Sequence, residues 1–401
     1  MSIAAAGEPA PAGARKRPKN RKSQLALAAA EMFCERGYHG VSLDEIATAV
    51  GISGPAIYRH FPNKYAMLVH ANRQLVEAVR AATDLSGRDD PRARLDELLA
   101  VLARLAVEHR RVAGLYQWEW RYLEPEHREE FLAELGTLAA RLTAPLRELR
   151  PELSGRDAHA LVRAALSVFG SLGTHRAAIA RGRAEVILRR VAWAMLSEEP
   201  ATPVLPATGH SEPEPVRGMT ARREILLAES IKLFHRHGYH AVGVEDIGRA
   251  AGINASSVYR YFPGKADILA AAFYRATERV AETTAAALAG ADGDADALER
   301  MVRSYVELTF ERSALVSVYL AENNNLPEAD RHELRKVQRL HVEEWVRLLV
   351  RLRSGLAVPE ARVLVHAALN LATDLSRLVR SDRRSGMDQH LTRLMLTVLR
   401  A

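Results

Sequence analysis

The chain has 401 residues, of which 48% are hydrophobic and 26% charged, and it carries a net charge of +7 and one cysteine. This length suits two or more domains, the charge favours an anionic partner such as nucleic acid or simply a basic surface, and one cysteine excludes a disulfide framework and a cysteine-based metal site. Because the sequence has neither a run of about 18 apolar residues nor a signal-peptide pattern, we expect a cytoplasmic protein with no membrane partner.

Residues 1–20 mix alanine, glycine and proline and end in a basic run without helical period, which predicts a disordered arm. The basic residues lead into the first expected helix, where they could bind DNA phosphates or enter the minor groove. The residues proposed for this contact are Arg17, Lys19, Arg21 and Lys22. The alternative is a tail that only improves solubility.

The next 45 or so residues carry the signals of a helix-turn-helix. A first helix is expected to end at Gly37, and Ser42 with Glu45 fits a capping box that starts a helix over 43–50. Gly51 makes the turn, and Ser53 is expected to cap a second short helix. Two short helices joined by a glycine turn are typical of a DNA-reading unit.

The second short helix is expected to present one face to the major groove of DNA, where early residues meet base edges and basic or tyrosine side chains reach phosphates. This face comprises Ser53, Gly54, Pro55, Ala56, Tyr58, Arg59 and His60. Lys64, at the start of the following helix, is expected to bind a phosphate. The alternative places Tyr58 and Phe61 in the core and leaves Arg59 and Lys64 as solvated charges.

The same unit occurs twice. When the sequence is shifted by 201 positions, Gly37–Lys64 falls on Gly238–Lys265 with 13 of 28 residues identical. Further matches follow at a shift of 203, such as Glu119 with Glu322, so a whole domain is duplicated. The second set of proposed DNA contacts is Arg222, Asn254, Ala255, Ser256, Ser257, Tyr259, Arg260, Tyr261 and Lys265.

The rest of the chain has helical periodicity and no convincing strand pattern, so we expect an all-α fold. Long helices are predicted at 91–109, 127–149, 156–181 and 183–197, with counterparts in the second half. Five prolines at 198–216 predict a linker. The expected division is a basic arm (1–20), a first DNA-binding domain (21–66), a first helical ligand and dimerisation domain (67–197), the linker (198–216), a second DNA-binding domain (217–267) and a second helical domain (268–401).

The pattern F-x-x-x-G-Y-x-x-V-S-x-x-x-I-A-x-x-x-G-I-S-x-x-x-I-Y-x-H-F, completed by P-N-K, resembles the DNA-binding region of the TetR family of bacterial transcriptional regulators. The resemblance covers residues 23–70 and 222–271. It implies an operator-binding regulator, a repressor, whose helical domains bind an effector and dimerise. It also implies a phosphate contact at Ser42, whose counterpart in the second copy is Gly243.

The duplication predicts two unequal DNA-reading heads, because the segments SGPAIYRH and NASSVYRY differ just before their shared Tyr and Arg. We therefore expect a double-stranded DNA operator that is asymmetric. The two halves could form an intramolecular pseudo-dimer or pair between chains in a homodimer, and the length of the linker leaves both open.

Aromatic and polar residues of the first half suggest a pocket for an apolar effector, acyl or lipid-like by analogy with the family. The proposed lining residues are Tyr116, Trp118, Trp120, Arg121, Phe169 and His175. The alternative reading makes the tryptophans ordinary core or interface residues. Glycines at 170 and 173, inside an expected helix, indicate close packing, room for a ligand, or glycines that the helix simply tolerates.

An enzyme is the rival class, but the sequence shows no HExxH, GxSxG or phosphate-cradling loop, and we expect no catalytic residues, metal or cofactor. A second rival is a DNA-binding or architectural protein that works without a ligand. Competition with unrelated DNA would separate such a protein from a sequence-specific regulator.

Overall fold

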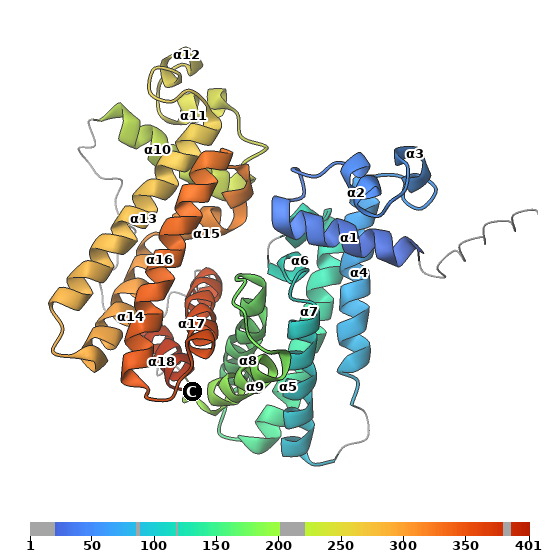
Figure 1. The fold of residues 1–401 in the computed structure, drawn as a ribbon, viewed down its shortest axis with the longest axis vertical. Coiled ribbons are helices and arrows are strands. Elements are labelled where there is room, and N and C mark those ends of the chain that lie inside the picture. The colour runs from blue at the N-terminus through green and yellow to red at the C-terminus, as the bar shows by residue number, and fades with distance from the viewer. Residues whose placement is uncertain (1–20, 86–88, 118, 201–220, 380–385) are drawn as a thin grey trace, which may run out of the picture.

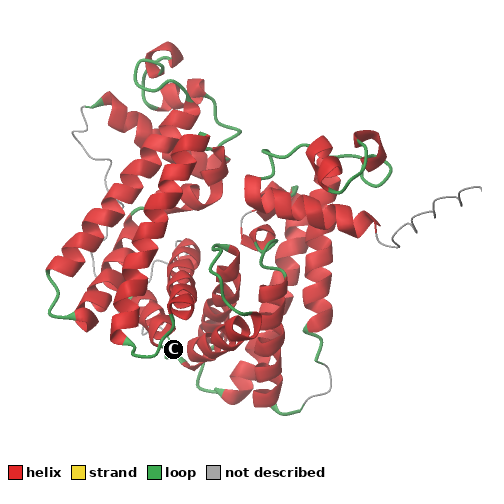
Figure 2. Ribbon diagram, in the orientation of Figure 1, coloured by secondary structure: helices red, strands yellow, loops and turns green. Residues whose placement is uncertain are grey.

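The computed structural model describes residues 21–85, 89–117, 119–200, 221–379 and 386–401. Within these ranges every regular element is a helix and there is no strand, which confirms the expected all-α class (Figure 2). No helix in the described part of the chain is long and apolar enough to span a membrane. Residues 1–20 and most of the predicted linker, 201–216, lie outside the described residues.

The first half begins with a three-helix head. Its helices are α1 (Arg21–Arg36), α2 (Leu43–Ala49) and α3 (Gly54–Ile57), and α4 (Lys64–Ala82) leads away from the head. The remaining helices are α5 (Pro91–Glu108), α6 (Gly114–Gln117), η1 (Glu119–Tyr122), α7 (Pro125–Leu149), α8 (Gly155–Gly170), η2 (Ser171–Gly173) and α9 (Arg181–Ser197).

The second half repeats this order. Its head contains α10 (Arg222–His237), α11 (Val244–Ala250) and α12 (Ala255–Val258). The rest consists of α13 (Lys265–Ala289), α14 (Asp294–Glu311), α15 (Ser313–Glu322), η3 (Asn323–Asn325), α16 (Glu328–Leu352), α17 (Val358–Val379) and α18 (Met387–Arg400).

The two halves lie side by side with both heads at the same end (Figure 1). Helices α8 and α9 of the first half pack on α17 and α18 of the second. Buried residues from these four helices belong to one continuous hydrophobic core, in which Val162 and Val168 join Leu364 and Leu371. Each head keeps a separate core of its own. In this structure the two halves of one chain therefore pack against each other.

One predicted helix is wrong in length. The expected helix over 156–181 stops at Gly170, and a short 3-10 turn and an irregular segment precede α9. The break coincides with the glycines at 170 and 173, whose missing side chains allow the backbone to approach α6 and the residue before it: a Cβ added to Gly173 would lie 2.5 Å from the Cβ of Ala113. The second half has Thr373 and Ser376 at these positions, and there α17 continues without a break.

Candidate nucleic-acid interface

The turn that leads into α2 is built as the sequence predicts. Gly37 has a φ of +79°, and Ser42 and Glu45 form the capping box, with the Ser42 N–H donating to Glu45 Oε2 at 2.8 Å. These hydrogen bonds and Arg36 lower the pKa of Glu45 to about 2. In the second head Gly243 has no side chain for the box, and only its N–H donates to Asp246, at 2.9 Å.

The recognition segment of the first head turns its expected face outward. Ile57 and Phe61 are buried in the core of the head, whereas Tyr58 is 58% exposed and Arg59 is also exposed. Ser53 and Pro55 are exposed, and Gly54, Ala56 and His60 are half-buried. The alternative in which Tyr58 belongs to the core is therefore wrong, although it holds for Phe61.

The second head presents the same face with different chemistry. Val258 and Phe262 are buried, Tyr259 is 54% exposed, and Arg260 and Tyr261 are exposed beside it. The remaining predicted contacts are the exposed Asn254 and Ser256 and the half-buried Ala255 and Ser257.

The two recognition helices also begin differently. The Asn254 side chain accepts a hydrogen bond from the Ser257 N–H at 2.8 Å and caps α12. Ser53 stands at the start of α3 but makes no such bond with its side chain, contrary to expectation. The side-chain oxygen of Asn254 therefore caps α12, whereas the Ser53 hydroxyl does not cap α3.

The two predicted phosphate-binding lysines point into their own heads instead. Lys64 Nζ donates to the carbonyl oxygens of Tyr38 at 2.8 Å and Val41 at 2.9 Å, and it lies 4.5 Å from the centre of the Tyr38 ring. Lys265 makes the equivalent bonds in the second head, to Tyr239 and to the carbonyl of residue 242, both at 2.7 Å. Burial lowers the pKa of both lysines. Each ammonium fastens the turn between the first two helices of its head.

Basic residues at the start of each head behave as a second matched set. Arg21 donates to the Val50 carbonyl at 3.1 Å and Arg222 to the Ala251 carbonyl at 3.4 Å, which in both heads is the end of the second helix. Lys22 Nζ lies 5.2 Å from the centre of the Phe61 ring. Arg17 and Lys19 lie outside the described residues.

The heads meet each other below their recognition helices, a contact that the sequence analysis missed. The rings of His39 and His240, which are equivalent residues of the two copies, lie 4.0 Å apart between their centres. Two equivalent buried carboxylates hold the adjoining turns: Glu119 accepts from the Tyr38 N–H at 3.2 Å, and Glu322 accepts from the Tyr239 N–H at 3.4 Å. The only sign of this contact in the sequence is the match of Glu119 with Glu322 at a shift of 203.

Arg121 supplies a positive charge at this contact between the heads, which we call the junction. Its guanidinium lies 3.4 Å from Glu322 and donates to the Ala321 carbonyl of the opposite half at 2.5 Å. Burial raises the pKa of Glu119 to about 7, and Arg121 acts against that rise. Glu322 is only 4% exposed. Two buried carboxylates, one from each half, thus share one nearby arginine.

The residues proposed for an effector pocket lie in different environments. Trp120 stacks on Phe131 at the edge of the first head's core, and Phe169 is buried in the core shared by the halves. His175 is buried and stacks on His366 of the second half, with 4.2 Å between ring centres. Burial lowers the pKa of His175 to about 2. Trp118 and the side chain of Tyr116 lie outside the described residues.

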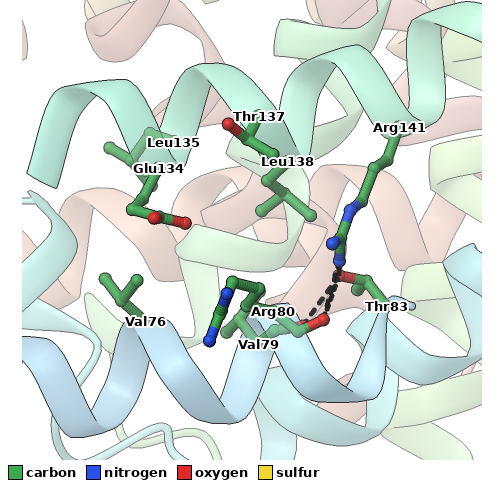
Figure 3. A pocket seen from close by; sticks show the side chains of 9 residues that line it. All are labelled: Val76, Val79, Arg80, Thr83, Glu134, Leu135, Thr137, Leu138 and Arg141. Atoms are coloured by element: carbon green, nitrogen blue, oxygen red, sulfur yellow. Dashed lines mark hydrogen bonds between the residues drawn. The ribbon is translucent and has the colours of Figure 1, made fainter.

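A small cavity of about 20 Å³, roughly the space of one water molecule, lies elsewhere in the first half, between α4 and α7 (Figure 3). Its walls include Val76, Val79, Leu135 and Leu138, and Arg141 stands at one end, where it donates to Thr83 Oγ1 at 2.7 Å. The four proposed pocket residues whose side chains the structure describes, Trp120, Arg121, Phe169 and His175, do not line this cavity. In the described part of the chain no group of three or more His, Cys, Asp or Glu side chains could hold a metal ion.

In a comparison with known protein families, both heads match the same family profile. The sequence profile described as "Bacterial regulatory proteins, tetR family" matches residues 26–71 and again 226–272. A second profile, "Tetracyclin repressor-like, C-terminal domain", matches residues 88–174. The first covers both helix-turn-helix units and the second covers α5 to α8.

Among curated proteins, the HTH-type transcriptional activator FasR of Mycolicibacterium smegmatis is 42% identical over 98 residues, which is 22% of this chain and 44% of FasR. The HTH-type transcriptional repressor KstR2 of Rhodococcus jostii is 28% identical over 137 residues, 32% of this chain and 64% of KstR2. The chain spans less than two thirds of either relative. The solved ketosteroid regulator KstR2 of Mycobacterium tuberculosis aligns over 45% of this chain and 94% of its own, with a TM-score of 0.41 and 19% identity.

Proposed function

Because this chain belongs to the TetR family of bacterial regulatory proteins and carries the family's N-terminal domain twice, we propose that it is a sequence-specific transcriptional regulator whose two unequal heads bind one operator. One observation carries the proposal. Both heads stand at the same end of a shared helical core (Figure 1). Each presents an exposed tyrosine and arginine beside a short recognition helix.

The proposed contacts divide into shared and unshared groups. Tyr58 and Arg59 and their counterparts Tyr259 and Arg260 are common to both heads and are assigned to phosphates, which position a protein on DNA. The residues just before them differ between the heads and are assigned to bases. Since the differing residues at 53–56 and 254–257 are exposed or half-buried, the two half-sites of the operator should have different sequences.

We further propose that the protein is a repressor released from DNA by a small apolar effector, of acyl or lipid-like chemistry. The relative KstR2 is named a repressor, whereas FasR is named an activator. The region 88–174 matches a tetracyclin repressor-like domain. The cavity between α4 and α7 is the candidate effector site, because the apolar side chains of Val76, Val79, Leu135 and Leu138 line it. Its volume of about 20 Å³ is too small for such a compound, so an effector that binds there has to favour a conformation in which α4 and α7 are farther apart.

Binding-site selection on random DNA tests the operator proposal. We expect an enriched site with two unlike halves, bound under an excess of unrelated DNA. Replacing the first head's segment SGPAI by the second head's NASSV should convert the selected site to a palindrome. A palindrome from the unmodified chain would refute unequal reading, and loss of binding under competitor DNA would indicate an architectural protein instead.

The effector proposal is tested by filling the cavity. Leu138→Trp should abolish the thermal shift that an acyl compound produces in the unmodified protein, because Leu138 lines the cavity. Leu132→Trp is the matched control, since Leu132 is on the same helix and is 45% exposed. Equal shifts in both variants would place the effector elsewhere.

A further inference from the structure

The contact between the two halves is not symmetric, although the halves are copies of one domain. Equivalent residues that meet across it have diverged: Ser167 on α8 meets Asn370 on α17, and Arg121 occupies the position of Asn324. These differences place polar groups of one half against complementary groups of the other.

The first asymmetric group lies where α8 crosses α17. Asn370 donates to both the carbonyl and the hydroxyl oxygen of Ser167, at 3.0 Å each, and Ser167 donates to Asp374 Oδ2 at 2.7 Å. Gln117 of the first half donates to Asn370 Oδ1 at 3.3 Å. Because Ser167 and Asn370 are buried, they cannot form hydrogen bonds with water, and these contacts supply their hydrogen-bond partners instead.

Pairing two copies of one half would break this group. With two second halves, a bulky asparagine would stand where Ser167 is, and Leu320 would replace the amide of Gln117. With two first halves, Ser171 would replace the carboxylate of Asp374, and serine would replace Asn370. Either like pair leaves buried polar groups without partners, which is costly.

The second asymmetric group is the junction below the heads. Arg121 of the first half lies 3.4 Å from Glu322 of the second, and the side chain of Glu322 is 5% exposed. In a pair of two second halves, Asn324 would stand in place of Arg121. Two buried Glu322 carboxylates would then face the junction without this arginine, and burial of an unpaired charge is strongly unfavourable.

We infer that the interface selects unlike halves: a first half pairs with a second half and neither pairs with its own copy. Arg121, Ser167 and Asn370 are the residues that set this specificity. The protein is therefore a two-headed unit containing one head of each kind. This inference goes beyond DNA binding and does not depend on it, since it concerns only which helical domains associate.

The test uses the full chain with a specific protease site inserted in the segment 201–216. After cleavage of the folded protein, native mass spectrometry should show one-to-one complexes of unlike fragments. Arg121→Asn should weaken the association of the fragments at least about tenfold, because it leaves a buried carboxylate unpaired. Arg111→Asn is the control, since Arg111 is 69% exposed and lies 3.4 Å from Glu31 of its own half; it should change nothing.

A gain of pairing checks the same residues independently of lost stability. In the cleaved chain carrying Asn324→Arg and Asn370→Ser, the second half keeps Asp374 and Glu322, so the new serine and arginine of one copy can pair with these carboxylates of another copy. Its second-half fragments should therefore form pairs with each other, unlike two first halves, which have Ser171 in place of Asp374. Circular dichroism verifies that each variant is folded, and Ser167→Asn replaces Arg121→Asn if the latter is not. Like pairs as abundant as unlike pairs in the unmodified cleaved protein would overturn the inference, as would equal association of Arg121→Asn and Arg111→Asn.

Discussion

Replacing Lys64 by methionine separates a structural lysine from a phosphate-binding one. The ammonium of Lys64 donates two hydrogen bonds to backbone carbonyls of its own head. Hydrogen bonds that involve a charged group contribute about 1.5–3 kcal/mol each. Because Lys64 is only half-buried and methionine keeps the aliphatic packing, we expect Lys64→Met to lower the free energy of unfolding by about 2–4 kcal/mol.

The same variant should leave the salt dependence of DNA binding unchanged. Each phosphate contact adds about 0.9 to the slope of log K against log salt concentration. Arg59→Met is the matched control, because Arg59 is exposed beside the recognition helix; it should reduce the slope by about 0.9 and hardly affect stability. The assays are urea titration and fluorescence anisotropy with operator DNA at several salt concentrations. A slope reduced by Lys64→Met with unchanged stability would refute the structural assignment.

Three further predictions concern stability. Burial lowers the folded-state pKa of His175 to about 2 and those of His341 and His366 to about 4. Acidification from pH 6.5 to 5 should therefore destabilise the fold by about 1.4 kcal/mol per pH unit for each of these histidines, because the unfolded chain takes up a proton that the folded chain does not. Glu119, whose pKa burial raises to about 7, acts in the opposite direction, and urea titrations that show constant stability over this range would contradict the net sign. Gly173→Ala should destabilise the fold because its Cβ would meet that of Ala113, whereas Gly136→Ala, in open space on α7, should stabilise it by roughly 0.5–1 kcal/mol; thermal denaturation that moves both variants in one direction would contradict this contrast. Asn254→Ala should cost about 1 kcal/mol through the lost helix cap and Ser53→Ala much less, so equal losses in urea titration would contradict the difference in capping.

The heads are predictable from the sequence because their signals are local. A capping box, a glycine turn and buried positions at Ile57 and Phe61 depend on residues within a few positions of one another, and the structure contains each of them. The roles of the basic residues were less predictable. Lys64 is 23 and 26 residues away from the two carbonyls that it binds, so no local pattern distinguishes it from a solvent-exposed lysine.

The proposed effector residues show the limit more clearly. Trp120, Phe169 and His175 have the composition of a pocket, but the structure distributes them between the core of a head and the interface of the halves. Composition indicates which side chains must be buried, because apolar area avoids water. It does not indicate against which surface they are buried.

The sequence by itself determined the helical class, the duplication and the outward faces of both recognition segments, since periodicity and repeated spacing are properties of the chain. Only the tertiary structure decided that the halves pack through α8, α9, α17 and α18 and that Arg121 lies beside a carboxylate 201 residues away. The physical reason is that a buried charge or amide is satisfied by whichever group the packing of helices brings within hydrogen-bond distance. That proximity is set by the shared core of α8, α9, α17 and α18, not by any pattern around the residues themselves.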